Sequence, residues 1–518
     1  MSQNGRQLVA TEVTNPENPE DSSEASSSDS EDAGATTQTD ASATASDAEA
    51  TRRLDLGLEP PHDPEAEAPP PRRRRRDRAK TVWRSFVDYM YPLSAGDSAA
   101  KSGSVRLEAL DAPRWIASIQ IVCYHMYERE GSFKQYATWF AVWTQLFFML
   151  SGFVLSYAEM VRPVKKGRQL SVLKYVRRRL TVIYPAFAFS LILVIAGAAV
   201  SSKHTKFEWQ VLPLHMLLAQ SWLPICVQES WGASCAPWVF NGEAWFLSVL
   251  VLYWLILRPL AAFFRQRGRL FCIAYIWASW VFCIVFHWAG HKNTLAKAIG
   301  CQDSVCINRI MVAIRAGPLG YLHVFSSGIA AARIFILSAM CDVQTGGPPT
   351  AESTKLMLAS SNAPCILRYG CCIGYASYVS VVFFATGLIE PYYYFFHNGG
   401  LIPVMFFVLV GAAVGEDPLA VWVFRCKPML VLGRISYLQY LMQHVVRNWM
   451  GNSFGWNSNT KIAFVPLLLA FSYGCQRFVE RPATSYQRWR QETGIKGCDD
   501  RCIERADAML DKVFKPKE

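Results

Sequence analysis

Long apolar segments recur along the chain from about residue 113 to residue 480, separated by shorter polar stretches. Most of them are long enough for an α-helix to cross the hydrocarbon core of a bilayer. We predict helical spans at about 113–127, 137–160, 182–202, 244–259, 270–289, 309–335, 368–390, 398–415, 427–448 and 461–478. This pattern predicts an all-α fold, a polytopic membrane helix bundle of about ten transmembrane helices. The first segment is short and carries polar residues, so we expect it to lie inside the bundle.

The chain before the spans has a different composition. Residues 1–104 contain few large apolar side chains, and the run SSEASSSDSEDAGATTQTDASATASDAEA has no aromatic residue. Such a segment cannot bury enough apolar surface to offset the entropy of ordering, which predicts a disordered, acidic N-terminal tail in the cytosol. The arginines at 72–76 either bind anionic lipid or form a solvated charge run. We expect the membrane domain at 105–485 and a cytosolic C-terminal tail at 486–518.

Positive charge is unevenly distributed between the spans. Residues 162–179 contain eight lysines and arginines and residues 258–269 contain four, whereas 203–243, 290–308 and 449–460 are much poorer in them. Under the positive-inside rule this bias predicts a multi-pass membrane protein with both termini in the cytosol. The formal net charge of +11 is therefore interpreted as membrane-orienting, with no nucleic-acid partner expected. Whether the protein lies in an endomembrane or the plasma membrane stays open.

Four cysteines fall in loops on the predicted non-cytosolic side, where an oxidising environment favours disulfides. They are Cys226 and Cys235 in the first long loop, and Cys301 and Cys306 in the second. Pairing within each loop and pairing between the loops are both open. Of the remaining cysteines, those within spans are interpreted as packing residues, and those in the C-terminal tail match no known metal-site spacing. We therefore expect no metal.

Arg114 and His125 lie in the first predicted span, within RWIASIQIVCYH. On an α-helix they are about three turns and about 16 Å apart, and they lie within roughly 20° of one face. Arg114 alone could be a snorkelling headgroup anchor, and His125 alone could be a packing histidine. An ionisable residue within a membrane is costly, and the pairing on one face favours a functional site.

Several further segments match, in order, the motifs of a known family. They are FFMLSGFVLS with Ser151, YVRRRLTVIYP with Arg178 and Arg179, NGEAWFLSVLVLYWL, ISYLQYLMQH and FVERP. With RWIASIQIVCYH they resemble the acyltransferase 3 family of integral-membrane O-acyltransferases, over about residues 105 to 490. Two motifs depart from the family pattern. Phe246 replaces a serine, Leu250 and Val251 replace acidic residues, and Val182 replaces an arginine. The missing carboxylates indicate an altered acceptor, a substitute such as Glu243, or a degraded site.

The resemblance implies transfer of an acyl group, with acetyl expected, from cytosolic acyl-CoA to a hydroxyl of a carbohydrate or lipid-like acceptor. Arg114, Arg178 and Arg179 would bind the phosphates of the acyl-CoA, because guanidinium groups bind phosphate bidentately. His125 would act as general base or form an acyl-histidine. The pantetheine arm of the acyl-CoA would bridge the distance between these cations and His125.

Four further residues are candidates for acceptor binding or catalysis, and three of them have a second, structural interpretation. Ser151 eases helix packing or is a nucleophile, and His444 packs or contacts the acceptor. Trp245 and Asn241 line the acceptor entrance, or Trp245 belongs to an interfacial aromatic belt. Two other functions fit the same pattern of spans. One is a membrane transporter or flippase, although the chain shows no internal repeat. The other is a catalytically inactive acyltransferase-like scaffold, which the missing carboxylates would explain.

Overall fold

The computed structural model describes residues 107–127, 134–161, 171–201, 206–229, 232–342, 347–349 and 356–492. The N-terminal tail predicted at 1–104, with its arginine run, lies outside the described residues, as does most of the predicted C-terminal tail. Helix α20 (Arg481–Glu492) runs across the domain boundary predicted at residue 485.

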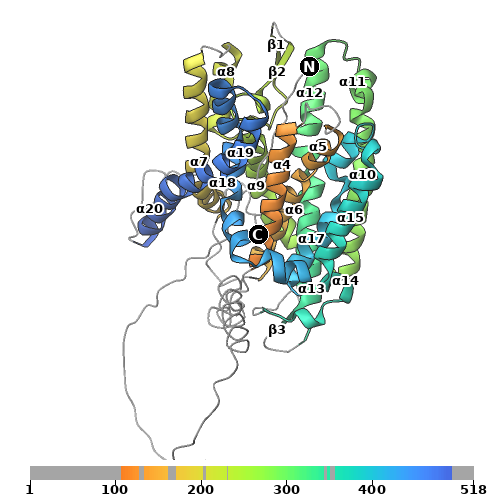
Figure 1. The fold of residues 1–518 in the computed structure, drawn as a ribbon. Coiled ribbons are helices and arrows are strands. Elements are labelled where there is room, and N and C mark those ends of the chain that lie inside the picture. The colour runs from red at the N-terminus through yellow and green to blue at the C-terminus, as the bar shows by residue number, and fades with distance from the viewer. Residues whose placement is uncertain are drawn as a thin grey trace, which may run out of the picture. The chain divides into compact units, whose positions relative to one another are not determined.

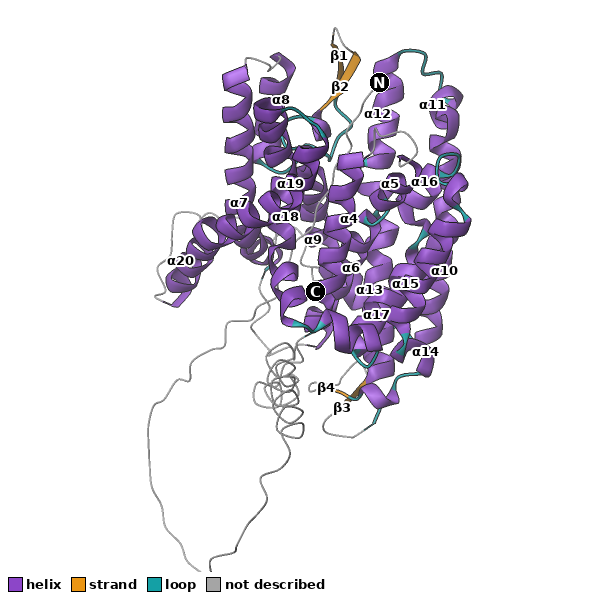
Figure 2. Ribbon diagram, viewed as in Figure 1, coloured by secondary structure: helices purple, strands orange, loops and turns teal. Residues whose placement is uncertain are grey.

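Most of the described residues are helical and very few are in strands, which confirms the predicted all-α fold (Figures 1 and 2). The long helices are α4 (Asp111–Tyr127), α6 (Thr144–Val161), α7 (Val172–Ser201), α9 (Trp245–Arg265), α10 (Arg269–Gly290), α13 (Leu322–Ala339), α15 (Gly370–Phe384), α17 (Ile402–Val414), α18 (Lys427–Phe454) and α19 (Ser458–Cys475). Shorter helices connect them: η1 (Glu108–Leu110), α5 (Lys134–Ala141), α8 (Lys206–Met216), η3 (Ala236–Trp238), η4 (Gly242–Ala244), η5 (His291–Asn293), α11 (Thr294–Ala298), α12 (Ser304–Arg315), η6 (Pro318–Gly320), η7 (Ser360–Asn362), α14 (Cys365–Arg368), η8 (Thr386–Leu388), α16 (Tyr393–Phe395), η9 (Phe396–Gly400), η10 (Ala420–Phe424) and η11 (Gln476–Glu480).

Seven helical segments of the described chain are long and apolar enough to cross a membrane. They are Lys134–Val161, Val172–Gly197, Gly242–Arg265, Arg269–Ala298, Leu322–Ala339, Tyr393–Val414 and Ser458–Tyr486. The other three predicted segments are helical too, as α4, α15 and α18, but they do not meet these criteria of length and composition. Helices α4 and α15 are short, with 17 and 15 residues, and α18 carries several polar and charged side chains.

Helix α4 lies inside the bundle, as its polar content predicted, and none of its side chains is exposed. It packs against α18, α5 and α6, and α6 in turn packs against α13. Most side chains in the spans that contain α6, α13 and α17 are also buried. Most side chains in the spans that contain α7, α10 and α19 are not, so these three helices present the apolar surface that a lipid environment would cover.

The prediction of one continuous span at 309–335 was wrong. Helix α12 ends at Arg315 and α13 begins at Leu322, with the short helix η6 between them. Gly317 and Pro318 explain the break, because proline has no backbone N–H to donate and glycine weakens a helix interior. Hydropathy alone did not reveal the break, since the residues on both sides of it are apolar.

The loops predicted on the non-cytosolic side contain ordered structure. Strands β1 (Cys226–Glu229) and β2 (Gly232–Cys235) form an antiparallel hairpin in which Cys226 lies opposite Cys235. These two cysteines form a disulfide, and Cys301 forms a second one with Cys306, so the pairing is within each loop. A second two-stranded sheet, β3 (Met340–Asp342) with β4 (Leu356–Leu358), lies beyond the C-terminal end of α13.

Candidate active site

Helices α4 and α18 pack against each other. They run in the same direction, because Arg114 and Gly433 meet near the beginning of both helices and His125 and Gln443 meet farther along both. They come close at Gly433, where a Cβ atom would lie 2.7 Å from the backbone oxygen of Asp111. Farther along, Ser118 donates a 3.1 Å hydrogen bond to the carbonyl of Ser436. We call the contact between residues 111–125 of α4 and residues 433–447 of α18 the α4–α18 seam. Glycine at position 433 permits this close approach, which sets how the side chains farther along the seam face one another.

Arg114 is buried in this seam, with 6% of its surface exposed. Its Nε donates a 3.1 Å hydrogen bond to Oγ of Ser436. Its Nη2 donates to the carbonyl of Gly433 and to Oδ1 of Asp111, both at 2.8 Å. The guanidinium therefore holds α4 against α18 at the end of the bundle where both helices begin. The part predicted for Arg114 in binding a polyanionic ligand stays a prediction.

Arg178 and Arg179 lie half-buried near the beginning of α7. Tyr437, the residue after Ser436, donates a 2.8 Å hydrogen bond to the carbonyl of Ile183. Arg179 is one helical turn, about 6 Å, from Ile183 towards the beginning of α7. Both arginines are thus near the level of the seam at which Arg114 is held.

Another cation joins this end of the bundle. The guanidinium carbons of Arg179 and Arg258 each lie 5.4 Å from the centre of the Tyr175 ring. Arg258 also pairs with Glu159 at 3.2 Å. Positive charge therefore gathers around Tyr175, and the face of that ring and one carboxylate partly stabilise it.

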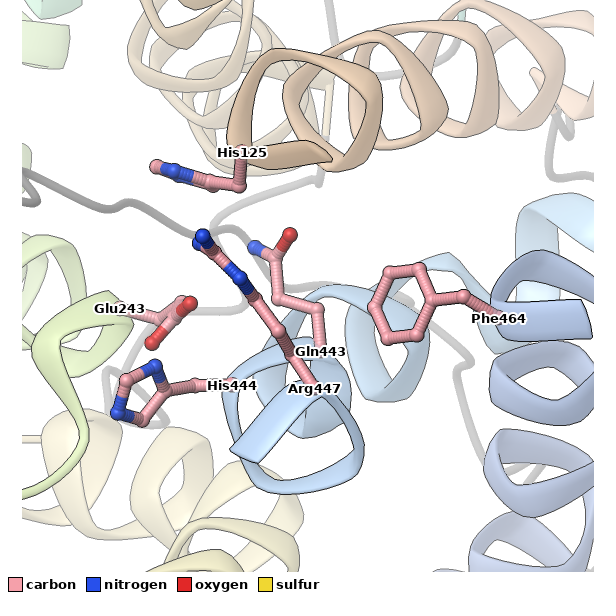
Figure 3. Close-up of a pocket in the computed structure, with 6 residues that line it drawn as sticks. All are labelled: His125, Glu243, Gln443, His444, Arg447 and Phe464. Carbon is pink, nitrogen blue, oxygen red and sulfur yellow. The ribbon is translucent and has the colours of Figure 1, made fainter. Parts of the chain in front are cut away.

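A narrow polar pocket lies at the far end of the seam (Figure 3). His125 contributes to it, three turns and about 16 Å along α4 from Arg114. The residues that line the pocket are His125, Glu243, Gln443, His444, Arg447 and Phe464. In Figure 3 the side chains of His125, Glu243 and Gln443 extend into the space between α4, η4 and α18. The structure thus brings together two predicted site residues, His125 and His444, with the carboxylate suggested as a replacement for the missing acidic motif.

Asn241 positions the turn that carries Glu243. Its side-chain amide donates to Oγ of Ser190 on α7 at 2.9 Å and to the carbonyl of Leu441 on α18 at 3.2 Å. These bonds tie η4 to two long helices, and Glu243 in η4 is fully buried. Asn241 was predicted at an acceptor entrance; it does not line the pocket, and its two bonds hold the turn in place.

Trp245 and Ser151 do not line the pocket. Trp245 is fully buried, and its ring packs on those of Phe148 and Tyr321. It therefore belongs to the aromatic core and not to an exposed interfacial belt. Ser151 is buried on α6, next to Gly152, where a Cβ atom would overlap the backbone carbonyl of Phe325 on α13. This contact fits the packing interpretation of Ser151.

The departures from the family motif are now located. Leu250 and Val251, which replace the acidic residues of the family motif, are buried in the apolar core on α9. Glu243 precedes Leu250 by seven residues, or about two helical turns. It is the buried acid that lines the pocket with His125. Across the described ranges, no group of three or more histidine, cysteine or acidic side chains is arranged to hold a metal ion.

Sequence reasoning missed Gln443, Arg447 and Phe464. A signal for the first two was present, because Gln439, Gln443 and Arg447 recur at intervals of four residues along one predicted span. Such spacing places polar side chains along one side of a helix. Phe464 on α19 gave no signal, since it resembles any other apolar residue of a span.

Most of the chain matches the model of one protein family. A family model described as an acyltransferase domain matches residues 107–475, which includes every helix from η1 to α19. Comparisons with curated proteins and with solved structures gave no match. The matched region covers well over half of the chain and contains the α4–α18 seam, the arginines of α7 and the polar pocket. The chain therefore belongs to the acyltransferase 3 family of membrane acyltransferases.

Proposed function

We propose that the protein transfers an acyl group, with acetyl expected, from acyl-CoA to a hydroxyl group of a carbohydrate or lipid-like acceptor. The observation that carries this proposal is the placement of His125 and Glu243 in one buried pocket. Arg114 lies about three turns from His125 in the same seam. A general base (His125) and an anion-binding region (near Arg114) at opposite ends of α4 suit a long substrate whose reactive group lies far from its phosphates.

The donor would bind with its phosphates at the arginine-rich end of the bundle, which we propose faces the cytosol, where acyl-CoA is made. Arg178 and Arg179 are half-buried and remain accessible enough to meet phosphate. Arg114 is buried and bonded to α18, so in this proposal it acts by holding the seam, next to the two arginines that meet the phosphates. Anionic lipids around the same end would be further partners.

The acceptor hydroxyl would give its proton to an imidazole nitrogen of His125 as its oxygen attacks the thioester carbonyl carbon. The tetrahedral intermediate then collapses, the carbon–sulfur bond breaks, and the CoA thiolate takes the proton from the imidazolium. The products are the ester and free CoA. The Glu243 carboxylate would stabilise the imidazolium between these steps, and Arg447 would stabilise the negative oxygen of the intermediate. His444 would contact the acceptor. No metal takes part in this scheme.

The test uses the purified full-length protein in detergent with labelled acetyl-CoA. We expect release of free CoA together with labelled ester when extracted lipids and carbohydrates are supplied as acceptors. His125→Ala should bind acetyl-CoA as the wild type does and lower transfer by at least about 10²-fold. His291→Ala, in η5 outside the pocket, is the matched control. Full transfer by His125→Ala would refute the assignment. A wild type that neither transfers nor hydrolyses acetyl-CoA would favour the transporter or the inactive scaffold, and failure to bind acetyl-CoA at all is the result expected of the scaffold.

A further inference from the structure

Two glutamines of α18 lie fully inside the protein. Gln439 and Gln443 have 0% and 2% of their surface exposed. Within the described part of the chain, neither the oxygen nor the nitrogen of either carboxamide has a hydrogen-bond partner. A buried amide that makes no hydrogen bond destabilises the fold relative to an apolar side chain of similar size. Packing alone therefore does not account for glutamine at these two positions.

The two glutamines occupy the stretch of α18 between the two ends of the proposed site. Ser436, which accepts the hydrogen bond from Arg114, precedes Gln439 by about 4.5 Å along the axis. Gln443 follows Gln439 after one turn, about 6 Å farther and about 40° around the helix. Gln443 lines the pocket beside His125. The carboxamides thus lie in sequence from the arginine end to the histidine end.

We infer that Gln439 and Gln443 bind the two amide groups in the pantetheine arm of the acyl donor. This inference rests on the proposed function. The two amides of the arm are separated by a β-alanine unit, one carbon longer than an α-amino acid, and are therefore about 5 Å apart. Their spacing is close to that of the two glutamines along the helix.

The hydrogen-bonding groups are complementary as well. Each secondary amide of the arm offers one N–H donor and one carbonyl acceptor, and each carboxamide offers both kinds of group in return. Gln439 binds the amide nearer the phosphates, and Gln443 binds the amide nearer the sulfur. The thioester then lies beyond Gln443, at the pocket that His125 and Glu243 line. The unpartnered carboxamides acquire partners only when the donor is bound.

This assignment predicts opposite effects on stability and on binding. Gln439→Leu or Gln443→Leu removes an unpartnered polar group, so the ligand-free protein should be as stable as the wild type or more stable. Each change should weaken binding of CoA by about 10-fold, and the double variant by about 100-fold, if each pair of hydrogen bonds contributes independently. A glutamine with only a packing role would show no such loss of affinity.

The experiment measures binding of CoA and of adenosine 3′,5′-bisphosphate, which lacks the arm, to the full-length protein in detergent. The glutamine variants should lose affinity for CoA and keep affinity for the bisphosphate, whereas Arg178→Ala should lose affinity for both. Gln220→Leu is the matched control, because Gln220 is equally buried and unpartnered among the described residues but lies outside the seam. Gln439→Met and Gln443→Met serve in place of any leucine variant that does not fold.

Unchanged affinity for CoA in folded glutamine variants would overturn the inference and leave the proposed function intact. A raised KM for the acceptor alone would also overturn it, since the carboxamides would then bind acceptor hydroxyls. Failure of the wild type to bind CoA at all would refute the proposed function itself.

Discussion

Replacing Arg114 by alanine should weaken the α4–α18 seam. The guanidinium donates across the seam from Nε to Ser436 and from Nη2 to the carbonyl of Gly433. The ion pair of Arg114 with Asp111 stays within α4 and contributes less to holding the two helices together. Hydrogen bonds from charged groups contribute about 1.5–3 kcal/mol each. Because neighbouring bonds are not fully additive, we expect a loss of about 3 kcal/mol in the free energy of unfolding.

Equilibrium unfolding in mixed detergent micelles measures this loss. The Arg114 side chain is only 7% exposed, so solvent screens its interactions little. The exposed ion pair between Lys134 and Glu390 is the control, and Lys134→Ala should cost less than about 1 kcal/mol. A double-mutant cycle of Arg114→Ala with Ser436→Ala should give a coupling energy of about 1 kcal/mol.

The same variants separate a structural role from ligand binding. Loss of the seam displaces His125 and changes the rate of transfer, whereas loss of a phosphate contact weakens binding of adenosine 3′,5′-bisphosphate. An Arg114→Ala protein whose unfolding free energy lies within about 0.5 kcal/mol of the wild type would refute the argument for the seam. Zero coupling with Ser436 would show that the hydrogen bond between them contributes nothing.

Three further predictions concern other parts of the molecule. Glu243→Gln keeps the shape of the side chain but not its charge, and should lower kcat by about 10²-fold with little change in KM for acyl-CoA; an unchanged kcat in steady-state kinetics would contradict this. Gly152→Ala places a Cβ atom against the carbonyl of Phe325 and should cost about 1–3 kcal/mol, whereas Gly474→Ala, with nothing within 4 Å, should be neutral or mildly stabilising in the same unfolding assay. Burial lowers the pKa of His215 to about 4. As the pH falls, the imidazole of His215 is therefore protonated in the unfolded chain before it is protonated in the folded protein. About 3 kcal/mol of stability should be lost between pH 6.5 and pH 4, and His215→Gln should remove this part of the pH dependence.

The positions of the helices were largely predictable because their cause is local. A run of apolar residues long enough to cross a bilayer forms a helix whatever its neighbours, since backbone groups in lipid must be bonded within the segment. The polar content of α4 even predicted its place inside the bundle. The break between α12 and α13 was missed because Gly317 and Pro318 stand between two apolar stretches that hydropathy does not separate.

The sequence predicted the geometry of the candidate site only for residues that share one helix. Arg114 and His125 share a helix, so their separation followed from helix geometry alone. That Arg114 is bonded to Ser436 and Gly433 depends on a helix more than 300 positions later in the chain. Trp245 likewise looked like an interfacial residue, and only the neighbouring rings of Phe148 and Tyr321 place it in the core.

Hydropathy, charge bias and ordered motifs were enough to predict a helical membrane protein and its family, because each depends on residues close together in the chain. The grouping of His125 with Glu243, Gln443 and Arg447 depends instead on how three distant segments pack. The close approach at Gly433 and the bonds of Asn241 set that packing. Such contacts join residues whose distance in space has no relation to their distance in sequence, so only the tertiary structure could show them.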